Sequence, residues 1–328
     1  MKWNSVFIGD ITELIIFLCL LMKIAMASNE RILPADVFIL GVQKAATTSL
    51  YALMEQNVAF CSTTLKEKHF FNSNYSWEKG FNSYEEMFSS CEKGKLTIDS
   101  TPMFSDEKVP PRLKESYPSD MISFKKFIVI FREPISREFS FYEQQIRRCA
   151  SAIYRKTTHN SALGRKSCEI LMPSYTPHVT AFSTITFREY YQSNKLEIWH
   201  SYYLHQLKMW LESIQRSQLF VINMETLIYN TSDTMKRLQR FLGLNYSWGN
   251  TVTLPHKHDA AHINATLDCK TYDDLKSHFD RVNAGLLDYI RNSPDKPPQE
   301  PYFPDFQDSR WKCRPVTFPA NFTVYIPP

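Results

Sequence analysis

The most informative stretch of this sequence is Val37-Phe-Ile-Leu-Gly41-Val-Gln-Lys44-Ala-Ala-Thr47-Thr48-Ser49-Leu50. Four apolar residues before Gly41 predict a short buried strand, and the three hydroxyl residues 47–49 are typical of the start of a helix. The amide groups at a helix N-terminus attract anions, and Lys44 adds a full positive charge beside them. Because the hydroxyls can also donate hydrogen bonds to phosphate oxygens, this pattern predicts a phosphate-binding turn at residues 44–49.

The turn differs from the phosphate loop of nucleoside triphosphate-binding proteins. That loop requires a glycine directly before its lysine, whereas Gln43 precedes Lys44, and no aspartate-rich pattern suggests magnesium ligands. The sequence therefore predicts a phosphate ligand without predicting a nucleoside triphosphate. An ordinary strand-to-helix turn, capped by threonines and with Lys44 facing solvent, is the alternative interpretation.

A second strand-to-helix unit follows the apolar run Phe127-Ile-Val-Ile-Phe131. Arg132 stands at the carboxyl end of this predicted strand, where ligands bind in open α/β sheets, and an arginine fork suits a phosphate. Pro134 is placed to start the next helix, and Ser140 lies two turns into it, so that its side chain could point back toward the same ligand. The alternative is an ion pair between Arg132 and a carboxylate, with Ser140 as an ordinary helix residue.

The rest of the chain alternates short β-branched runs with helical segments, which predicts an α/β fold with a parallel sheet. Strands are predicted at residues 37–41, 58–61, 96–98, 127–131 and 219–222. Helices are predicted at residues 48–56, 83–89, 135–148, 196–214, 231–242 and 272–291.

Composition indicates one folded domain in these 328 residues, since 43% of the side chains are apolar and 14% are aromatic. The formal net charge of +4 is too small to indicate nucleic-acid binding, but it suits a groove that receives an anionic substrate. Residues 149–186 have little periodicity and are interpreted as a long excursion, and the proline-rich residues 294–328 as an irregular tail packed on the domain. These boundaries place the main domain at residues 34–293, after a short linker at residues 28–33.

Residues 1–27 are predicted to be a targeting segment. A membrane-spanning helix built on the apolar run 14–22 would also have to include three charged residues. A cleavable signal peptide needs a shorter apolar core and small residues after it, which Ala25-Met26-Ala27 provides. Both interpretations stay open, and both send the rest of the chain into the secretory lumen.

The cysteines agree with that compartment. Removal of Cys19 with the targeting segment leaves an even number, and pairing of neighbours (61–91, 149–168 and 269–313) is one of many possible disulfide connectivities. No C-x-x-C spacing suggests a zinc site. Sequons for N-glycosylation, which also favour the secretory pathway, occur at Asn74, Asn230, Asn245, Asn264 and Asn321.

The two phosphate motifs together resemble the Golgi carbohydrate sulfotransferases, and most closely the branch that acts on heparan and chondroitin sulfates. Residues 44–49 look like the 5′-phosphosulfate loop of that family, and Arg132 with Ser140 looks like its 3′-phosphate motif. The resemblance continues at Lys66-Glu67-Lys68-His69-Phe70-Phe71 and at Ile98-Asp99-Ser100-Thr101-Pro102, and covers most of residues 34–290. It implies the sulfotransferase fold, a P-loop-like parallel sheet flanked by helices.

The resemblance also implies an activity and a set of roles. The protein would transfer a sulfuryl group from 3′-phosphoadenosine 5′-phosphosulfate (PAPS) to a hydroxyl of an anionic, glycosaminoglycan-like polysaccharide in the Golgi lumen. Glu67 would be the general base, and Lys44 would stabilise the oxygen that leaves sulfur. The 5′-phosphosulfate would be bound by Lys44, Ala45, Ala46, Thr47, Thr48 and Ser49, and the 3′-phosphate by Arg132 and Ser140. No metal would be needed, and an uncleaved segment 1–27 would anchor the protein in the Golgi membrane as a single-pass type II protein.

Two departures from the family pattern bear on these roles. Relatives often have glycines where Ala45 and Ala46 stand, so here the backbone must approach the phosphate without glycine's freedom. Heparan-type enzymes often have a lysine where Ser100 stands, which puts a second cation near the sulfuryl group in doubt. This difference favours a chondroitin or dermatan acceptor over heparan sulfate.

Three rival functions stay open beside carbohydrate sulfation. Protein-tyrosine sulfation would use the same donor, and a luminal P-loop kinase would also need a phosphate turn. A relative that binds the nucleotide without catalysis is the third.

Other polar residues around Glu67 have open roles. His69 is a rival base, but we expect its side chain to face away from Glu67 and to be structural. Lys66 and Lys68 either contact the substrate or form a solvated basic edge.

Basic pairs at residues 147–148, 155–156 and 165–166 are predicted to line a groove for the anionic acceptor, since phosphate-like anions prefer arginine. Scattered solvated charges are the alternative interpretation. The segment His256-Lys257-His258 is a candidate for adenine contacts.

Overall fold

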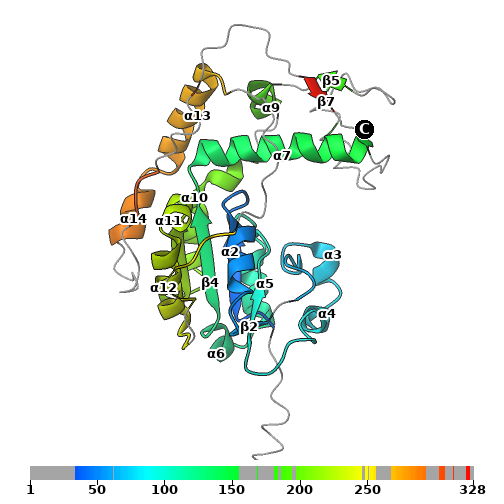
Figure 1. The fold of residues 1–328 in the computed structure, drawn as a ribbon, viewed down its shortest axis with the longest axis vertical. Helices are drawn as coiled ribbons and strands as arrows, with labels where there is room; N and C mark the ends of the chain where they lie inside the picture. The colour runs from blue at the N-terminus through cyan, green and yellow to red at the C-terminus, as the bar shows by residue number, and fades with distance from the viewer. Residues whose placement is uncertain are drawn as a thin grey trace, which may run out of the picture. The chain divides into compact units, whose positions relative to one another are not determined.

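The first strand, β1, lies in the middle of a five-stranded parallel sheet in the computed structural model of the chain (Figure 1). The strand order is β2-β3-β1-β4-β6, and every neighbouring pair runs in the same direction. The five strands are β1 (Val37–Gly41), β2 (Phe60–Cys61), β3 (Leu96–Asp99), β4 (Lys126–Phe131) and β6 (Leu219–Asn223). The predicted α/β fold is therefore confirmed, with each of the five predicted strands in place.

The structure describes residues 34–61, 63–154, 168, 181–183, 186–193, 197–245, 248–249, 251–255, 267–292, 303–306, 313 and 323–325. Contacts divide the chain into two units, Met1–Pro34 and Ala35–Pro328, and the sheet with its helices belongs to the second. The predicted targeting segment and linker, residues 1–33, lie outside the described residues. No helix within the described ranges is both long and apolar enough to cross a bilayer.

The central strands are apolar because helices cover both faces of the sheet. All five residues of β1 and of β6 are buried, and β4 is buried from Phe127 to Phe131. Phe38 of β1 pairs with Phe127 of β4, and their rings stack with centroids 5.2 Å apart. Because all strands are parallel, the loops that follow β1, β2, β3 and β4 meet at one edge of the sheet. That edge receives ligands in folds of this kind.

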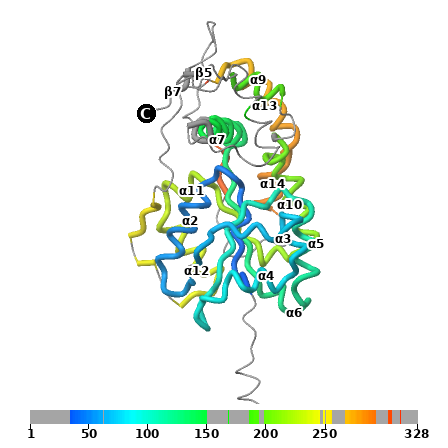
Figure 2. The backbone as a smooth tube through the Cα atoms, turned by 90° about the vertical axis from the view of Figure 1, so that its right-hand side faces the viewer, coloured from blue at the N-terminus to red at the C-terminus, as the bar shows by residue number. Residues whose placement is uncertain are grey.

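Two helical layers sandwich the sheet (Figure 2). One layer contains α2 (Thr47–Met54), α11 (Met224–Tyr229) and α12 (Thr231–Leu242). The other contains α3 (Asn74–Trp77), α4 (Phe81–Glu86), α5 (Val109–Ser116), α6 (Ser119–Ile122) and α10 (Tyr203–Leu211). Right-handed crossovers place α2 on one face and α3 to α6 on the other, because the chain moves in one direction along the sheet from β1 to β2 and in the opposite direction from β2 through β3 to β4.

A long helix, α7 (Pro134–Tyr154), crosses above the carboxyl edge of the sheet in both views (Figures 1 and 2). It begins at Pro134, as predicted, and the Glu133 carboxylate caps it by accepting hydrogen bonds from the amides of Ile135 (2.9 Å) and Ser136 (2.7 Å). Its path takes it past the turn between β1 and α2. Two further helices, α9 (Phe187–Ser193) and α13 (Cys269–Val282), pack against α7 in a second apolar cluster, whereas α14 (Leu286–Asn292) packs against the core of the sheet.

Two predicted helices are each broken, and the side chain of Asn283, at the second break, satisfies backbone groups at the first. The predicted helix 196–214 consists of a 3₁₀ turn, η1 (Glu197–Ser201), followed by α10. The Asn283 side chain donates to the Ser201 carbonyl (2.9 Å) and accepts from the Leu204 amide (3.3 Å), so it satisfies backbone groups that a continuous helix would pair internally. The predicted helix 272–291 ends at Asn283 and resumes as α14 after Gly285, whose φ of 82° suits glycine.

All three predicted disulfides are present: Cys61–Cys91, Cys149–Cys168 and Cys269–Cys313. The prediction of an irregular C-terminal tail is wrong at β7 (Thr323–Tyr325), which pairs antiparallel with β5 (Ala181–Ser183). Phe303 of the tail is buried, with its ring centroid 6.3 Å from that of Phe131. The tail therefore contacts the end of β4.

Candidate active site

The predicted phosphate-binding turn connects β1 to α2 at the carboxyl edge of the sheet (Figure 1). The Val42 amide donates to the Ile130 carbonyl of β4 (2.9 Å), and the Ala45 amide donates to the Val42 carbonyl (3.2 Å). Helix α2 begins at Thr47, and the first amides of a helix have no acceptor within it. The polar side chains of Lys44, Thr48 and Ser49 on this turn are half-buried. The turn therefore offers amides, hydroxyls and a cation to one anion.

Two residues of the turn adopt the left-handed backbone conformation, Lys44 at φ 72° and Ala46 at φ 60°. A side chain with a Cβ rarely adopts this conformation, whereas glycine adopts it freely. Ala45 is not among the residues with positive φ, and its side chain is fully buried. Of the two alanines that stand where relatives have glycines, only Ala46 is strained.

We expect Ala46→Gly to raise the free energy of unfolding by about 0.5–1 kcal/mol, because relief of left-handed strain outweighs the added freedom of the unfolded chain. Ala45→Gly is the matched control and should lower the free energy of unfolding by about 1 kcal/mol, because its backbone is unstrained. Urea unfolding of both variants measures the difference. If Ala46→Gly were less stable than the parent, the left-handed backbone at Ala46 would not be strained.

Lys44 lies among positive charges. Burial lowers the pKa of Lys44 to about 8, with repulsion by Arg147, Arg132 and Arg148 adding to that effect, and Glu143 opposing it. A lysine held among three arginines is poised to bind an anion, because the anion relieves both the repulsion and the loss of hydration.

Arg147 and Arg148 were predicted to line the acceptor groove, yet both act electrostatically on Lys44. Arg147 follows Ser140 by seven residues on α7, which places both residues on the same helix face. The seven-residue spacing is visible in the sequence, so the shared helix face of Ser140 and Arg147 could have been predicted. The other predicted groove residues, 155–156 and 165–166, and the adenine candidate 256–258 lie outside the described residues.

Arg132 connects the two phosphate motifs. It follows β4 directly, its side chain is buried, and its guanidinium donates to the Lys44 carbonyl (2.9 Å). The hydroxyl of Tyr203 donates to the carbonyl of Arg132 (2.9 Å), which fixes the backbone at this point. Ser140 is half-buried on α7. The structure thus brings Lys44 and Arg132 together, as the sequence predicted, and part of the arginine fork holds the phosphate turn.

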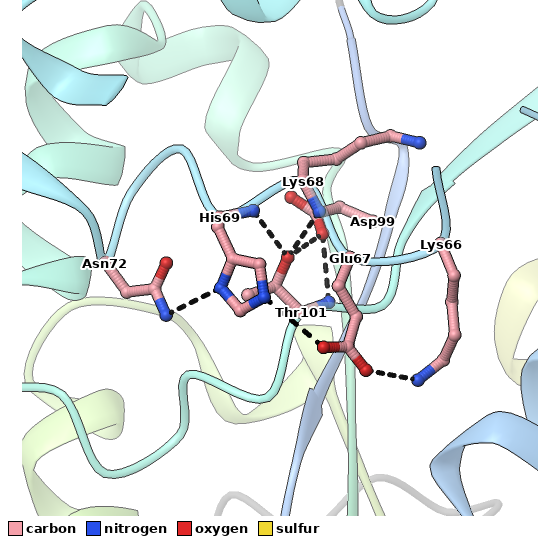
Figure 3. A network of polar contacts seen from close by, with 7 residues as sticks. All are labelled: Lys66, Glu67, Lys68, His69, Asn72, Asp99 and Thr101. Atoms are coloured by element: carbon pink, nitrogen blue, oxygen red, sulfur yellow. Dashed lines mark hydrogen bonds and ion pairs between the residues drawn. The ribbon is translucent and has the colours of Figure 1, made fainter. Parts of the chain in front are cut away.

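Glu67 lies in the loop between β2 and α3 and carries two ion pairs (Figure 3). Its carboxylate oxygens lie 2.8 Å from Lys66 Nζ and 3.3 Å from His69 Nε2. The hydrogen bond from His69, more than that from Lys66, lowers the pKa of Glu67 to about 2, and burial opposes the shift. The same carboxylate raises the pKa of His69.

The expectation that His69 faces away from Glu67 is wrong. Residues two apart along an extended segment share a face, and the two side chains are in contact. The Nδ1 atom of His69 lies 3.3 Å from Nδ2 of Asn72, so the ring is held on both sides. Asn72 was not predicted to be a site residue.

A cavity of about 220 Å³ opens beside Glu67. It is lined by Leu40, Val42, Gln43, Glu67, His69, Asn72, Pro102, Phe104, Ser105 and His200. Gln43 directly precedes Lys44, so the cavity adjoins the phosphate turn. A polar group placed there would lie between the Glu67 carboxylate and the turn at residues 44–49. His200 is a further polar lining residue that the sequence did not indicate.

The two lysines beside Glu67 differ in burial and in their hydrogen-bond partners. Lys66 is half-buried and engaged with Glu67, whereas Lys68 is buried and donates to Thr63 Oγ1 and to the Leu65 carbonyl. Neither lines the cavity. Both predicted roles of Lys68, substrate contact and solvated edge, are therefore wrong, because its ammonium group points into the protein.

No group of three or more histidine, cysteine, aspartate and glutamate side chains suited to a metal ion occurs within the described ranges. The chemistry that the described residues offer at this edge of the sheet is that of cations, hydroxyls, amides, imidazoles and the carboxylate of Glu67.

Curated relatives of the chain include enzymes named for heparan sulfate. Heparan sulfate glucosamine 3-O-sulfotransferase 3B1 of Mus musculus is 25% identical over 214 residues, which are 64% of this chain and 46% of that protein. Heparan sulfate glucosamine 3-O-sulfotransferase 5 of Homo sapiens is 24% identical over 209 residues, 63% of this chain and 52% of that protein. The chain therefore spans about half the length of these relatives.

The family and the fold are shown by two further matches. A sulfotransferase from Alicyclobacillus acidocaldarius, known from its crystal structure, superposes with a TM-score of 0.54 and 17% identity, covering 78% of this chain and 95% of that chain. This likeness shows a shared fold. Residues 34–277 match the sulfotransferase domain. Because this match covers most of the chain, the protein belongs to the sulfotransferase domain family.

Proposed function

We propose that the protein is a PAPS-dependent sulfotransferase that modifies a hydroxyl of a glycosaminoglycan-like polysaccharide. The observation that carries the proposal is the common edge of the sheet, where the Lys44 turn, Arg132 and the cavity beside Glu67 adjoin. A cationic phosphate site next to a carboxylate-lined cavity is what transfer from an anionic donor to a hydroxyl requires.

The residues present fit an adenosine 3′,5′-bisphosphate donor. Residues 44–49 would hold the 5′-phosphosulfate through the Lys44 side chain, the backbone of Ala45 and Ala46, and the hydroxyls of residues 47–49. Arg132 and Ser140 would hold the 3′-phosphate. The cations that lower the pKa of Lys44 support this fit, since they disfavour a further positive charge and favour an anion at the same point. Because Arg147 is one of these cations, we include it in the proposed donor site.

The donor supplies an activated sulfuryl group, whose transfer is an in-line displacement. Glu67 would accept the proton of the acceptor hydroxyl, and Lys44 would neutralise charge on the departing oxygen. In the free protein a pKa of about 2 keeps Glu67 ionised but makes it a weak proton acceptor. A glycan that fills the cavity would displace water, and that burial would raise the pKa of Glu67 toward a more effective value.

Two observations favour different acceptors. Ser100 stands where heparan-type enzymes often have a lysine, which favours chondroitin or dermatan sulfate, whereas the curated relatives are named for heparan sulfate. Ser100 is fully buried and does not line the cavity, so it says little about the acceptor. We therefore propose heparan sulfate first and a chondroitin or dermatan glycan second.

An acceptor panel tests the function. The purified protein would receive sulfur-labelled PAPS with heparan sulfate, chondroitin, dermatan or an acidic tyrosine peptide, followed by disaccharide analysis of the products. Label in a heparan disaccharide is expected, and label in a galactosamine disaccharide would select the second acceptor. Label in the peptide alone would indicate a tyrosine sulfotransferase. Nucleotide binding without transfer to any acceptor would indicate a relative that has lost catalysis.

Arg132→Ala is expected to weaken binding of adenosine 3′,5′-bisphosphate by about 10–100-fold, because it removes charge-assisted hydrogen bonds to the 3′-phosphate. It also frees the Lys44 carbonyl, which loosens the phosphate turn. Calorimetric titration measures the affinity, and Arg240→Ala, at an exposed position on α12, is the control. Unchanged affinity in Arg132→Ala would show that the 3′-phosphate binds elsewhere.

The pH dependence of the donor reaction is expected to reveal Lys44. As pH rises through about 8, Lys44 loses its proton and kcat/KM for the donor should fall. The value of kcat at saturating donor should fall only at higher pH, because a bound anion raises the pKa of Lys44. Lys44→Arg, which stays charged, should remove the basic limb of kcat/KM. If kcat/KM for the donor still fell above about pH 8 in this variant, the fall would be due to the titration of another group.

The three disulfides are consistent with the secretory pathway. With the family resemblance, they support a proposed location in the Golgi lumen, where PAPS and the polysaccharide acceptor would be the partners.

A further inference from the structure

Thr101, two residues after β3, holds the loop that contains Glu67 (Figure 3). Its hydroxyl oxygen accepts hydrogen bonds from the amides of Lys68 (2.9 Å) and His69 (3.1 Å). The hydroxyl donates to Oδ1 of Asp99 (2.6 Å). Because a hydroxyl has one donor hydrogen and two acceptor sites, all of its hydrogen-bonding capacity is used.

Asp99 fixes the direction of that hydroxyl. Its carboxylate is fully buried and also accepts from the Thr101 amide (3.0 Å) and the Tyr84 hydroxyl (2.8 Å). Burial raises the pKa of Asp99, and the hydrogen bonds from Thr101 and Tyr84 oppose that shift. Backbone amides can only donate, so Thr101 must turn its hydrogen toward Asp99 and its lone pairs toward the loop.

The loop needs such a support. His69 has a φ of 51°, a left-handed conformation that a residue with a side chain adopts only where its surroundings impose it. The Ser100 amide adds a second tie by donating to the Lys66 carbonyl (3.2 Å). Residues 100–101 therefore grip the backbone on both sides of Glu67.

We propose that the Thr101 hydroxyl is a positioning group for the reaction, which holds Glu67 and its partner His69 in place beside the cavity. The inference rests on the proposed function, since it takes Glu67 to be the base. Thr101 does not line the cavity and acts only through the loop backbone. A displacement of about 1 Å in a catalytic group can cost about 10²-fold in rate, so the loss of this hydrogen-bonded support should appear in kcat.

Thr101→Val removes the hydroxyl and keeps the shape, and we expect it to lower kcat by about 10²-fold while affinity for adenosine 3′,5′-bisphosphate stays unchanged. Thr101→Ser keeps the hydroxyl and should retain most of the rate. Tyr84→Phe is the matched control, because it removes a buried hydrogen bond to the same Asp99 but leaves the bonds from Thr101 to the loop intact. It should lower the melting temperature without a comparable loss of kcat.

A double-mutant cycle separates positioning from general stability. In a Glu67→Gln background, Thr101→Val should cause no further loss of kcat, because the group that it positions is already disabled. An additional loss as large as in the parent would overturn the proposal, as would equal losses of kcat in Thr101→Val and Tyr84→Phe.

Should Thr101→Val not fold, Thr101→Ser decides alone: a rate as low as that of Glu67→Gln overturns the proposal, and a retained rate supports it. A normal rate in Glu67→Gln itself would instead refute the proposed base.

Discussion

Glu67→Gln is expected to lower kcat for sulfuryl transfer by about 10²–10⁴-fold, the usual contribution of a positioned proton acceptor. The amide keeps the size of the side chain but cannot take the proton of the acceptor hydroxyl. Affinity for adenosine 3′,5′-bisphosphate should stay unchanged, because the carboxylate belongs to the cavity and not to the phosphate turn. Single-turnover kinetics and calorimetric titration measure the two quantities separately.

The control for this variant is Glu92→Gln. The Glu92 side chain is 76% exposed and pairs only with the nearby Lys95 among its described contacts, so its loss should leave kcat unchanged. Unchanged turnover in Glu67→Gln would place the base elsewhere. His69 would then be the first candidate, because its ring lines the same cavity.

The sheet could be predicted from the sequence because parallel strands buried on both faces leave continuous apolar runs. The run 127–131 and the run before Gly41 are such signals, and both are central strands. The breaks at Tyr202 and at residues 283–285 could not be predicted from periodicity alone, since both helices continue the same apolar pattern. The break at Tyr202 depends on Asn283, which makes its hydrogen bonds across a sequence distance of 79 to 82 residues.

The site was predictable where the chemistry stands at the ends of neighbouring strands, and unpredictable where it depends on the path of a helix or the bend of a loop. Lys44 and Arg132 stand at strand ends, so their meeting follows from strand adjacency. The repulsion of Lys44 by Arg147 depends on the path of α7 across the sheet edge, which no local pattern specifies. The contact between His69 and Glu67 is local, but spacing alone did not predict it, because the loop is not regularly extended at His69, whose φ is 51°.

Lys44→Met is expected to lower kcat by about 10²–10³-fold, because it removes the cation that would stabilise charge on the departing oxygen. Nucleotide affinity should also fall, since the same ammonium group serves the bound 5′-phosphate. Lys276→Met is the matched control. The Lys276 side chain is 53% exposed on α13 and forms an ion pair with Asp280, four residues later on the same helix. Kinetics at saturating acceptor, with donor concentration varied, separate the two losses.

The same substitution should stabilise the free protein, because Lys44 is held among like charges. Folding lowers its pKa from 10.5 to about 8, so the folded state binds the proton less tightly than the unfolded state. At pH 7 both states are protonated and folding bears the full cost of the charge, whereas stability rises as pH climbs from about 8 toward 10.5. Methionine removes that cost, so Lys44→Met without ligand should melt above the parent at pH 7 and lose most of the stabilisation by nucleotide. A lower melting temperature combined with an undiminished shift on adding nucleotide would show that Lys44 supports the fold and does not bind the donor.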